Sequence, residues 1–162
     1  MSTAESVILD ALYEQDRTAW LEAMAELIRS GRLEQLDYSN LAGCLDDMAR
    51  RERREVINRL SSLIAQLLKW RNLPEKRSGC WRASVEIQQQ ELTELLESKS
   101  LRNHAGEILE RAYANGIKQV VTETGLPLLT FPGACPYSLD AMLSEPLSLS
   151  QDNSIQIDTG AR

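Results

Sequence analysis

The stretch Asp37–Trp70, DYSNLAGCLDDMARRERREVINRLSSLIAQLLKW, decides the fold. It contains no proline and a single glycine, Gly43, and its apolar residues recur at helical spacing on both sides of the charged block RRERRE. Pro74 follows it, and a proline disfavours helical conformation in the residue before it. The spacing therefore predicts a long helix over about 38–72.

The apolar residues of this helix fall into two groups separated by an arginine-rich span. The first group is Leu41, Cys44, Leu45 and Met48, and the second is Val56, Leu60, Leu63, Ile64, Leu67 and Leu68. A straight helix of about 36 residues measures roughly 54 Å, whereas a compact domain of this chain length is roughly 40 Å across. We therefore expect the helix either to bend near residues 49–54 or to project and rest against another chain.

The rest of the chain is also predicted to be helical. Helices are expected over about 5–14, 17–30, 79–98, 101–124 and 139–144, with Asp16, Asp37, Ser78 and Ser138 as N-caps and Gly31 and Gly125 as stops. Residues 126–137 hold three of the five prolines and are expected to be irregular. The fold class is therefore all-α, a single bundle of five to six helices built on the long helix.

Chain length and composition favour one domain. The chain has 162 residues, is rich in good helix formers and contains only 5% aromatic residues. We expect a single helical domain over residues 1–145. Residues 146–162 are polar and lack an amphipathic period, so we expect a disordered tail there.

Charge and cysteine usage suggest the compartment and the partners. The formal net charge is −6, yet the span from Arg50 to Arg82 has ten Lys and Arg against three Glu. The three cysteines form no CxxC pair, which is typical of reduced thiols in the cytoplasm. No apolar run approaches the length needed to span a membrane, so we expect no membrane partner.

Several motifs occur in the order found in a known family. They are LYEQDRTAWLEAMAELIRSGRLEQLDYSNLAGCLDDMARRERRE from Leu12, LLKW from Leu67, WRASVEIQQQ from Trp81, RAYANGIKQVVTETGLP from Arg111 and FPGACPYSLDAML from Phe131. Over roughly residues 5–145 the chain resembles the bacterial, largely cyanobacterial, domain-of-unknown-function family twenty-nine. The resemblance implies an all-helical fold and no established activity.

This chain departs from the family pattern at several positions. It reads NLAGCLD where the family usually reads NLAEEIE, and it has Gln66 where the family typically has His. Ala49 and Arg51 replace the family's Gly and Ser. A family site built on those carboxylates and that histidine would be incomplete here, and the loss of the glycine favours a continuous helix.

The arginines of the long helix are the candidate binding surface. They are Arg50, Arg51, Arg53, Arg54 and Arg59, which could meet phosphate or an acidic partner. Trp70 and Trp81 could serve as stacking platforms for single-stranded nucleic acid. The alternative is a solvated helix face with weak ion pairs such as Arg51–Glu55, and tryptophans in the core.

Other reactive side chains give weaker signals. Cys80 lies near a predicted helix N-terminus, which favours the thiolate, so it is a candidate reactive thiol. His104 is the only histidine, and one His-x-x-Glu motif falls short of a di-metal site. Asp46 and Asp47 point about 100° apart on a helix. We therefore expect no cofactor, no metal site and no catalytic residue.

The predicted function is that of a small cytoplasmic interaction or adaptor protein without catalysis, with a protein partner or a homo-oligomer. One alternative is a nucleic-acid-associated, antitoxin-like regulator that uses the basic 50–82 region. Another is a hydrolase or nuclease with a degenerate site, which would bring Asp46, Asp47, Gln66 and His104 into one pocket.

Overall fold

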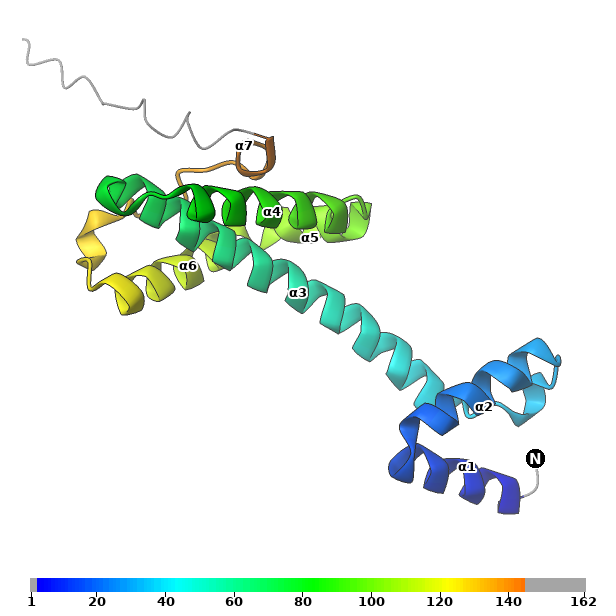
Figure 1. Ribbon diagram of the computed structural model, residues 1–162. Helices are drawn as coiled ribbons and strands as arrows, with labels where there is room; N and C mark the ends of the chain where they lie inside the picture. The colour runs from blue at the N-terminus through cyan, green and yellow to red at the C-terminus, as the bar shows by residue number, and fades with distance from the viewer. Residues whose placement is uncertain (1–2, 145–162) are drawn as a thin grey trace, which may run out of the picture. The chain divides into compact units, whose positions relative to one another are not determined.

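The computed structural model describes residues 3–144, with side chains from Val7 onward. Over these residues it has seven α-helices, three short 3₁₀ turns and no strand, which confirms the all-α class (Figure 1). Helix α3 (Tyr38–Asn72) confirms the predicted long helix. The predicted tail at 146–162 lies outside the described residues.

The chain divides into two compact units, Met1–Arg51 and Glu52–Arg162. We name them the N-terminal unit and the C-terminal unit and describe each by itself. The first 14 residues of α3 belong to one and the remainder to the other. One domain over 1–145 stays a prediction.

The N-terminal unit contains α1 (Thr3–Gln15), α2 (Arg17–Arg29), the 3₁₀ turn η1 (Leu33–Gln35) and the start of α3. Asp16 caps α2 as predicted, because its Oδ1 accepts a hydrogen bond of 3.0 Å from the Ala19 N–H. Gly31 ends α2 in the left-handed conformation, with φ of +71°. The Arg32 N–H then donates to the Leu27 carbonyl at 2.9 Å, which closes the helix end.

The N-terminal unit has a small core. Its buried members are Trp20, Met24, Leu27, Leu36 and Cys44. The rings of Tyr13 and Trp20 meet edge to face, with centroids 4.9 Å apart. Asp37 joins α3 to this core, because its carboxylate accepts hydrogen bonds from the Asn40 N–H at 3.2 Å and from the Trp20 Nε1 at 3.3 Å. The predicted Asp37 cap is therefore confirmed.

The C-terminal unit continues from α3 with six further elements. They are the 3₁₀ turn η2 (Pro74–Lys76), α4 (Gly79–Leu95), α5 (Lys99–Glu107), α6 (Leu109–Thr124), the 3₁₀ turn η3 (Leu128–Thr130) and α7 (Leu139–Ser144). Ser78 and Ser138 accept from the Trp81 and Ala141 N–H groups, so both predicted caps are confirmed. Gly125 ends α6 with φ of +71°, as predicted.

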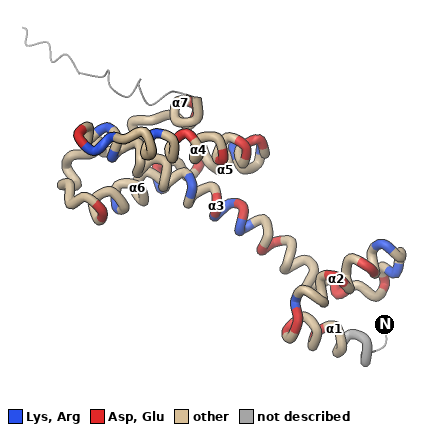
Figure 2. The backbone as a smooth tube through the Cα atoms, in the orientation of Figure 1, with Lys and Arg blue, Asp and Glu red and all other residues tan. Residues whose placement is uncertain are grey.

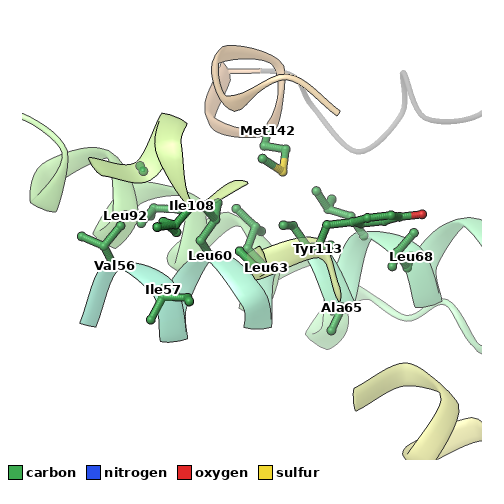
Figure 3. Packing of buried hydrophobic residues seen from close by; sticks show 14 of the residues in the cluster. Val56, Ile57, Leu60, Leu63, Ala65, Leu68, Leu92, Ile108, Tyr113 and Met142 are labelled. Carbon is green, nitrogen blue, oxygen red and sulfur yellow. The ribbon is translucent and has the colours of Figure 1, made fainter. Parts of the chain in front are cut away.

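The core of the C-terminal unit surrounds more than half of the circumference of α3. Val56, Leu60, Leu63 and Leu68 contribute to this core from α3, and α4, α5, α6 and α7 supply the side chains that pack on them (Figure 3). Helix α7 also joins α4 through a hydrogen bond of 2.7 Å from Gln89 Nε2 to the Met142 carbonyl. The second predicted apolar group of the long helix is therefore core.

The predicted helix over 101–124 is wrong in one respect, because it breaks at Ile108. This residue has φ of −99° and ψ of 6°, and its buried side chain packs in the core. The break loses little hydrogen bonding, since the Ile108 N–H still donates to His104 O at 3.0 Å and the Ala112 N–H to Ile108 O at 2.9 Å. It raises the number of described helices from the six that the sequence predicts to seven.

The first predicted apolar group of the long helix is only partly core. Cys44 is buried and Leu41 packs against the core, but Leu45 and Met48 are each 60% exposed. Leu45 lies about 100° around the helix from Cys44, and Met48 lies one turn beyond Cys44, the last buried residue of α3 in this unit. Leu45 and Met48 therefore do not join the core, although their spacing groups them with Leu41 and Cys44.

Gly116 allows α6 to approach α3 closely. A Cβ at this position would lie 3.0 Å from Ile64 Cγ2, 3.1 Å from Ser61 O and 3.3 Å from Ala65 N. The last two atoms belong to the backbone of α3, which cannot move aside as the end of a side chain can. The absence of a side chain at Gly116 thus sets the distance between the two helices.

Gly116→Ala is expected to lower the free energy of unfolding. Overpacking costs about 1–3 kcal/mol, which exceeds the gain of about 0.5–1 kcal/mol in helix propensity. Gly106→Ala is the matched control, because nothing lies within 4 Å of its Cβ position in α5. Urea denaturation followed by circular dichroism should show a destabilised Gly116→Ala and an unchanged or more stable Gly106→Ala. Equal stability of the two variants would contradict the close approach.

Candidate functional site

The predicted arginine surface is divided between the two units. Arg50 and Arg51 belong to the N-terminal unit, and Arg53, Arg54 and Arg59 to the C-terminal unit. Arg50 Nη1 lies 3.5 Å from Asp47 Oδ1. Within residues 3–144 no ion pair involves Arg51, Arg53 or Arg54, and all three are exposed (Figure 2 colours the charged residues of α3).

Arg59 forms hydrogen bonds with two carboxylates of its own unit. Its Nε lies 2.5 Å from Glu55 Oε1, and its Nη1 also donates to Glu91 of α4. These hydrogen bonds, first that to Glu55, raise the pKa of Arg59 above its ordinary value. The predicted Arg51–Glu55 pair is therefore replaced by Arg59–Glu55. These residues line a polar cavity of about 270 Å³ together with Asn58, Ser62 and Gln88.

The two tryptophans of the C-terminal unit are not arranged as stacking platforms. Trp70 is buried, and its ring meets that of Trp81 edge to face with centroids 5.4 Å apart. The Arg77 guanidinium lies 5.2 Å from the Trp70 ring centroid, and Arg77 Nε donates to the Trp70 carbonyl at 2.7 Å. Trp81 Nε1 donates to Gln66 Oε1 at 3.1 Å. The alternative, that both rings belong to the core, fits these contacts.

The cysteines lie in three different environments, and all three thiols are free. Cys80 is exposed in the first turn of α4. Cys44 is buried, and its sulfur accepts a hydrogen bond of 3.2 Å from Arg17 Nη2. That guanidinium also lies 4.9 Å from the Tyr13 ring centroid and 3.9 Å from Asp47 Oδ2. Cys80 is thus the accessible thiol, which is compatible with the proposal that it reacts.

A partly buried group surrounds Cys135 in the irregular segment. Burial raises the pKa of the Cys135 thiol, and the Glu110 carboxylate adds to this. Burial also raises the pKa of Tyr137, against the opposing charge of Arg71. The Tyr113 hydroxyl donates to the Pro132 carbonyl at 2.7 Å, which ties α6 to the segment. These groups favour their neutral forms and support packing.

Of the residues named for the degenerate hydrolase or nuclease, Asp46 and Asp47 belong to the N-terminal unit, and Gln66 and His104 to the C-terminal unit. Gln66 accepts its hydrogen bond from Trp81, and Asp47 contacts Arg17 and Arg50. His104 is half-buried in α5 of the C-terminal unit. Within the described chain, no three His, Cys, Asp or Glu side chains gather closely enough to hold a metal ion. The contacts of Gln66 and Asp47 are thus structural.

Exposed apolar side chains are concentrated in the N-terminal unit. Among the described residues they are Val7, Ile8, Leu21, Ile28, Leu33, Tyr38, Leu45 and Met48. The C-terminal unit, which is longer, exposes Ile87, Leu128 and Leu129. Single exposed apolar residues are ordinary, but such a concentration on one small unit is typical of an interaction surface.

The N-terminal unit also contains a groove. A cavity of about 300 Å³ is lined by Ile8, Leu9, Ala23, Glu26, Leu27, Arg32 and Gln35. Its lining combines four apolar residues of α1 and α2 with polar residues at the edge. The apolar spacing of α2 does not reveal this groove, because the spacing is the same whether neighbouring helices cover one side of α2 or two. What the sequence could have indicated is that the N-terminal unit contains more large apolar residues than so short a segment can bury.

Thiol labelling should separate the three cysteines. With Ellman's reagent at pH 8, Cys80 is expected to react first, and the other two at least about tenfold more slowly, because Cys44 requires local opening and Cys135 is partly buried with a raised pKa. Cys80→Ser should remove the fast phase, whereas Cys135→Ser should leave it. A fast phase that survives Cys80→Ser would contradict the assignment.

Comparisons with known proteins bear on the family alone. No curated protein and no solved structure matches the chain significantly. Among the described helices, none is both long and apolar enough to cross a bilayer. A family model described as "Domain of unknown function DUF29" matches residues 12–147. That match covers most of the chain, including both units, and the chain therefore belongs to the DUF29 family.

Proposed function

We propose that the protein is a helical interaction or adaptor protein that acts without catalysis and binds another protein chain through its N-terminal unit. The observation that carries this proposal is the concentration of exposed apolar side chains on that unit. Three free thiols also support action in the reducing cytoplasm.

The spacing of the exposed residues supports the proposal. Leu41, Leu45 and Met48 follow one another at i, i+4 and i+7 on α3, and only the first packs on the core. Leu21 and Ile28 are seven residues apart on α2, so they share a face. Apolar seams of this spacing are stable in water when another helix or sheet covers them.

The apolar side chains exposed on the N-terminal unit could contribute free energy of binding. Burying one large apolar side chain contributes about 1.5–3 kcal/mol to a complex, and several such residues together could offset the cost of association, about 4–15 kcal/mol. The N-terminal unit has only a small core of its own. Small units commonly gain stability through a partner.

Site-specific photo-crosslinking tests the proposal in cells that make the protein. Benzoyl-phenylalanine at Met48 is expected to give adducts with a protein, because this side chain lies on the uncovered seam. The same group at Ala42, an exposed position on another face of the same helix, is the matched control and should give few adducts. Equal adduct yields at the two positions, or none at either, would refute an interaction through this seam.

Nucleic-acid binding is the second candidate function. It is favoured by one observation, the exposure of Arg51, Arg53 and Arg54 without an ion pair among residues 3–144. Glu52 and Glu55 interrupt these arginines and reduce the local positive charge. Trp70 is buried, and Trp81 packs against it edge to face, which disfavours the use of these two rings as stacking platforms for bases. We therefore rank this function below protein binding.

Replacement of Arg51, Arg53 and Arg54 by Ala tests the second candidate. If these arginines bind phosphate, the slope of log affinity against log salt should become shallower by about 0.7–0.9 for each phosphate that the variant no longer neutralises. Fluorescence anisotropy with single-stranded RNA and duplex DNA, at several salt concentrations from about 50 to 200 mM, measures this slope. Lys118→Ala, an exposed change on α6, is the control. A wild-type chain that does not bind at low salt would remove this candidate.

A further inference from the structure

The groove of the N-terminal unit has the dimensions and lining of a site for large apolar side chains. Its volume of about 300 Å³ is about twice that of an engineered cavity that holds benzene, about 150 Å³. Ile8 and Leu9 come from α1, and Ala23 and Leu27 from α2. The groove thus has room for about two aliphatic or aromatic anchors of one partner helix, which is the way amphipathic helices dock.

The edge of the groove carries both signs of charge. Glu26 Oε2 lies 3.7 Å from Arg29 Nη1, and both side chains are largely exposed. Arg32 Nε donates to Ser30 Oγ at 3.0 Å. Glu22 and Glu34 are exposed and stand next in sequence to Ala23 and Gln35 of the lining.

The charge of the whole unit is strongly negative. Residues 1–51 contain ten Asp and Glu and five Arg, a formal net charge of −5. Residues 52–162 contain fourteen Asp and Glu and thirteen Lys and Arg, a net charge of −1. Figure 2 shows the acidic residues distributed over α1 and α2. Nearly all of the excess negative charge of the chain therefore belongs to the unit that carries the groove.

We propose that the groove between α1 and α2 binds a cationic amphipathic helix of another protein, with two of its apolar residues in the cavity and its Lys or Arg near the acidic residues of this unit. This inference rests on the proposed function and names the partner class. Opposite charge steers such a helix toward the unit and disfavours acidic partners. A second copy of the chain is less suited, because it would bring another unit of net charge −5 against the first.

Synthetic peptides test the partner class with the full chain. The first is an 18-residue helix with Leu at i, i+4 and i+7, Lys on the opposite face and Ala at the remaining positions. The second carries Glu in place of Lys, and the third has the composition of the first with its leucines scattered around the helix. Fluorescence anisotropy at 50 mM salt is expected to show binding of the first at least about tenfold tighter than of the other two, and weakening of it at 500 mM salt.

Two neighbouring substitutions on α1 locate the binding. Ile8 and Val7 are exposed to similar extents, 65% and 62%, but only Ile8 lines the groove. Ile8→Ser should weaken binding of the cationic peptide about tenfold, because loss of one buried apolar side chain costs at least the 1.4 kcal/mol of a tenfold change. Val7→Ser should leave the affinity within about twofold, since it removes no lining residue.

Other outcomes would overturn the inference. Equal affinity for the acidic peptide would exclude charge selection, and an Ile8→Ser variant that binds as wild type would exclude the groove. A wild-type dimer in light scattering that Ile8→Ser dissociates would identify a second copy as the occupant. If no peptide binds, the partner class is wrong, while crosslinking at Met48 decides independently whether the N-terminal unit binds a protein.

Discussion

Helix α3 has to bury an apolar surface that runs from Val56 to Leu68, and the C-terminal unit is arranged around that requirement. The helices after it in the chain supply the cover, and Gly116 lets the backbone of α6 reach the backbone of α3 at Ser61 and Ala65. The polar contacts lie around this packing. Lys69 Nζ lies 2.6 Å from Glu123 Oε2, and this contact lowers the pKa of the Glu123 carboxyl below its ordinary value. Because both groups are partly exposed, they support the arrangement without determining it.

The N-terminal unit buries its apolar side chains less completely. Its buried core is small, and polar contacts such as Trp20 to Asp37 join helices that few apolar side chains hold together. Leu45 and Met48 continue the seam of α3 beyond the part that α2 covers. The same unit carries the exposed seam, the groove and most of the excess negative charge of the chain, and these three features support the proposal that it binds another protein.

The local features could be predicted from the sequence because each depends on a few adjacent residues. Asp16, Ser78 and Gly125 act at helix ends, through contacts with adjacent residues or through their own backbone conformation. Their roles can therefore be recognised from the sequence alone. The break at Ile108 was not visible, since the apolar period continues through it. The exposure of Leu45 was also missed, because it depends on the extent of the helices packed against α3. The groove and the position of Arg77 over Trp70 likewise depend on which segments meet.

Asp37 combines two duties that are usually separate. One carboxylate oxygen accepts from the first turn of α3, while the other accepts from Asn40 Nδ2 at 2.7 Å and from the Trp20 indole at 3.3 Å. Serine could serve as an N-cap at this position, but its single hydroxyl oxygen has no second acceptor atom for the indole. The residue at which α3 begins is therefore specified by the packing of α2 as well as by the helix. A substitution at position 37 would thus disturb the contact with α2 as well as the start of α3, although the position looks like an ordinary cap.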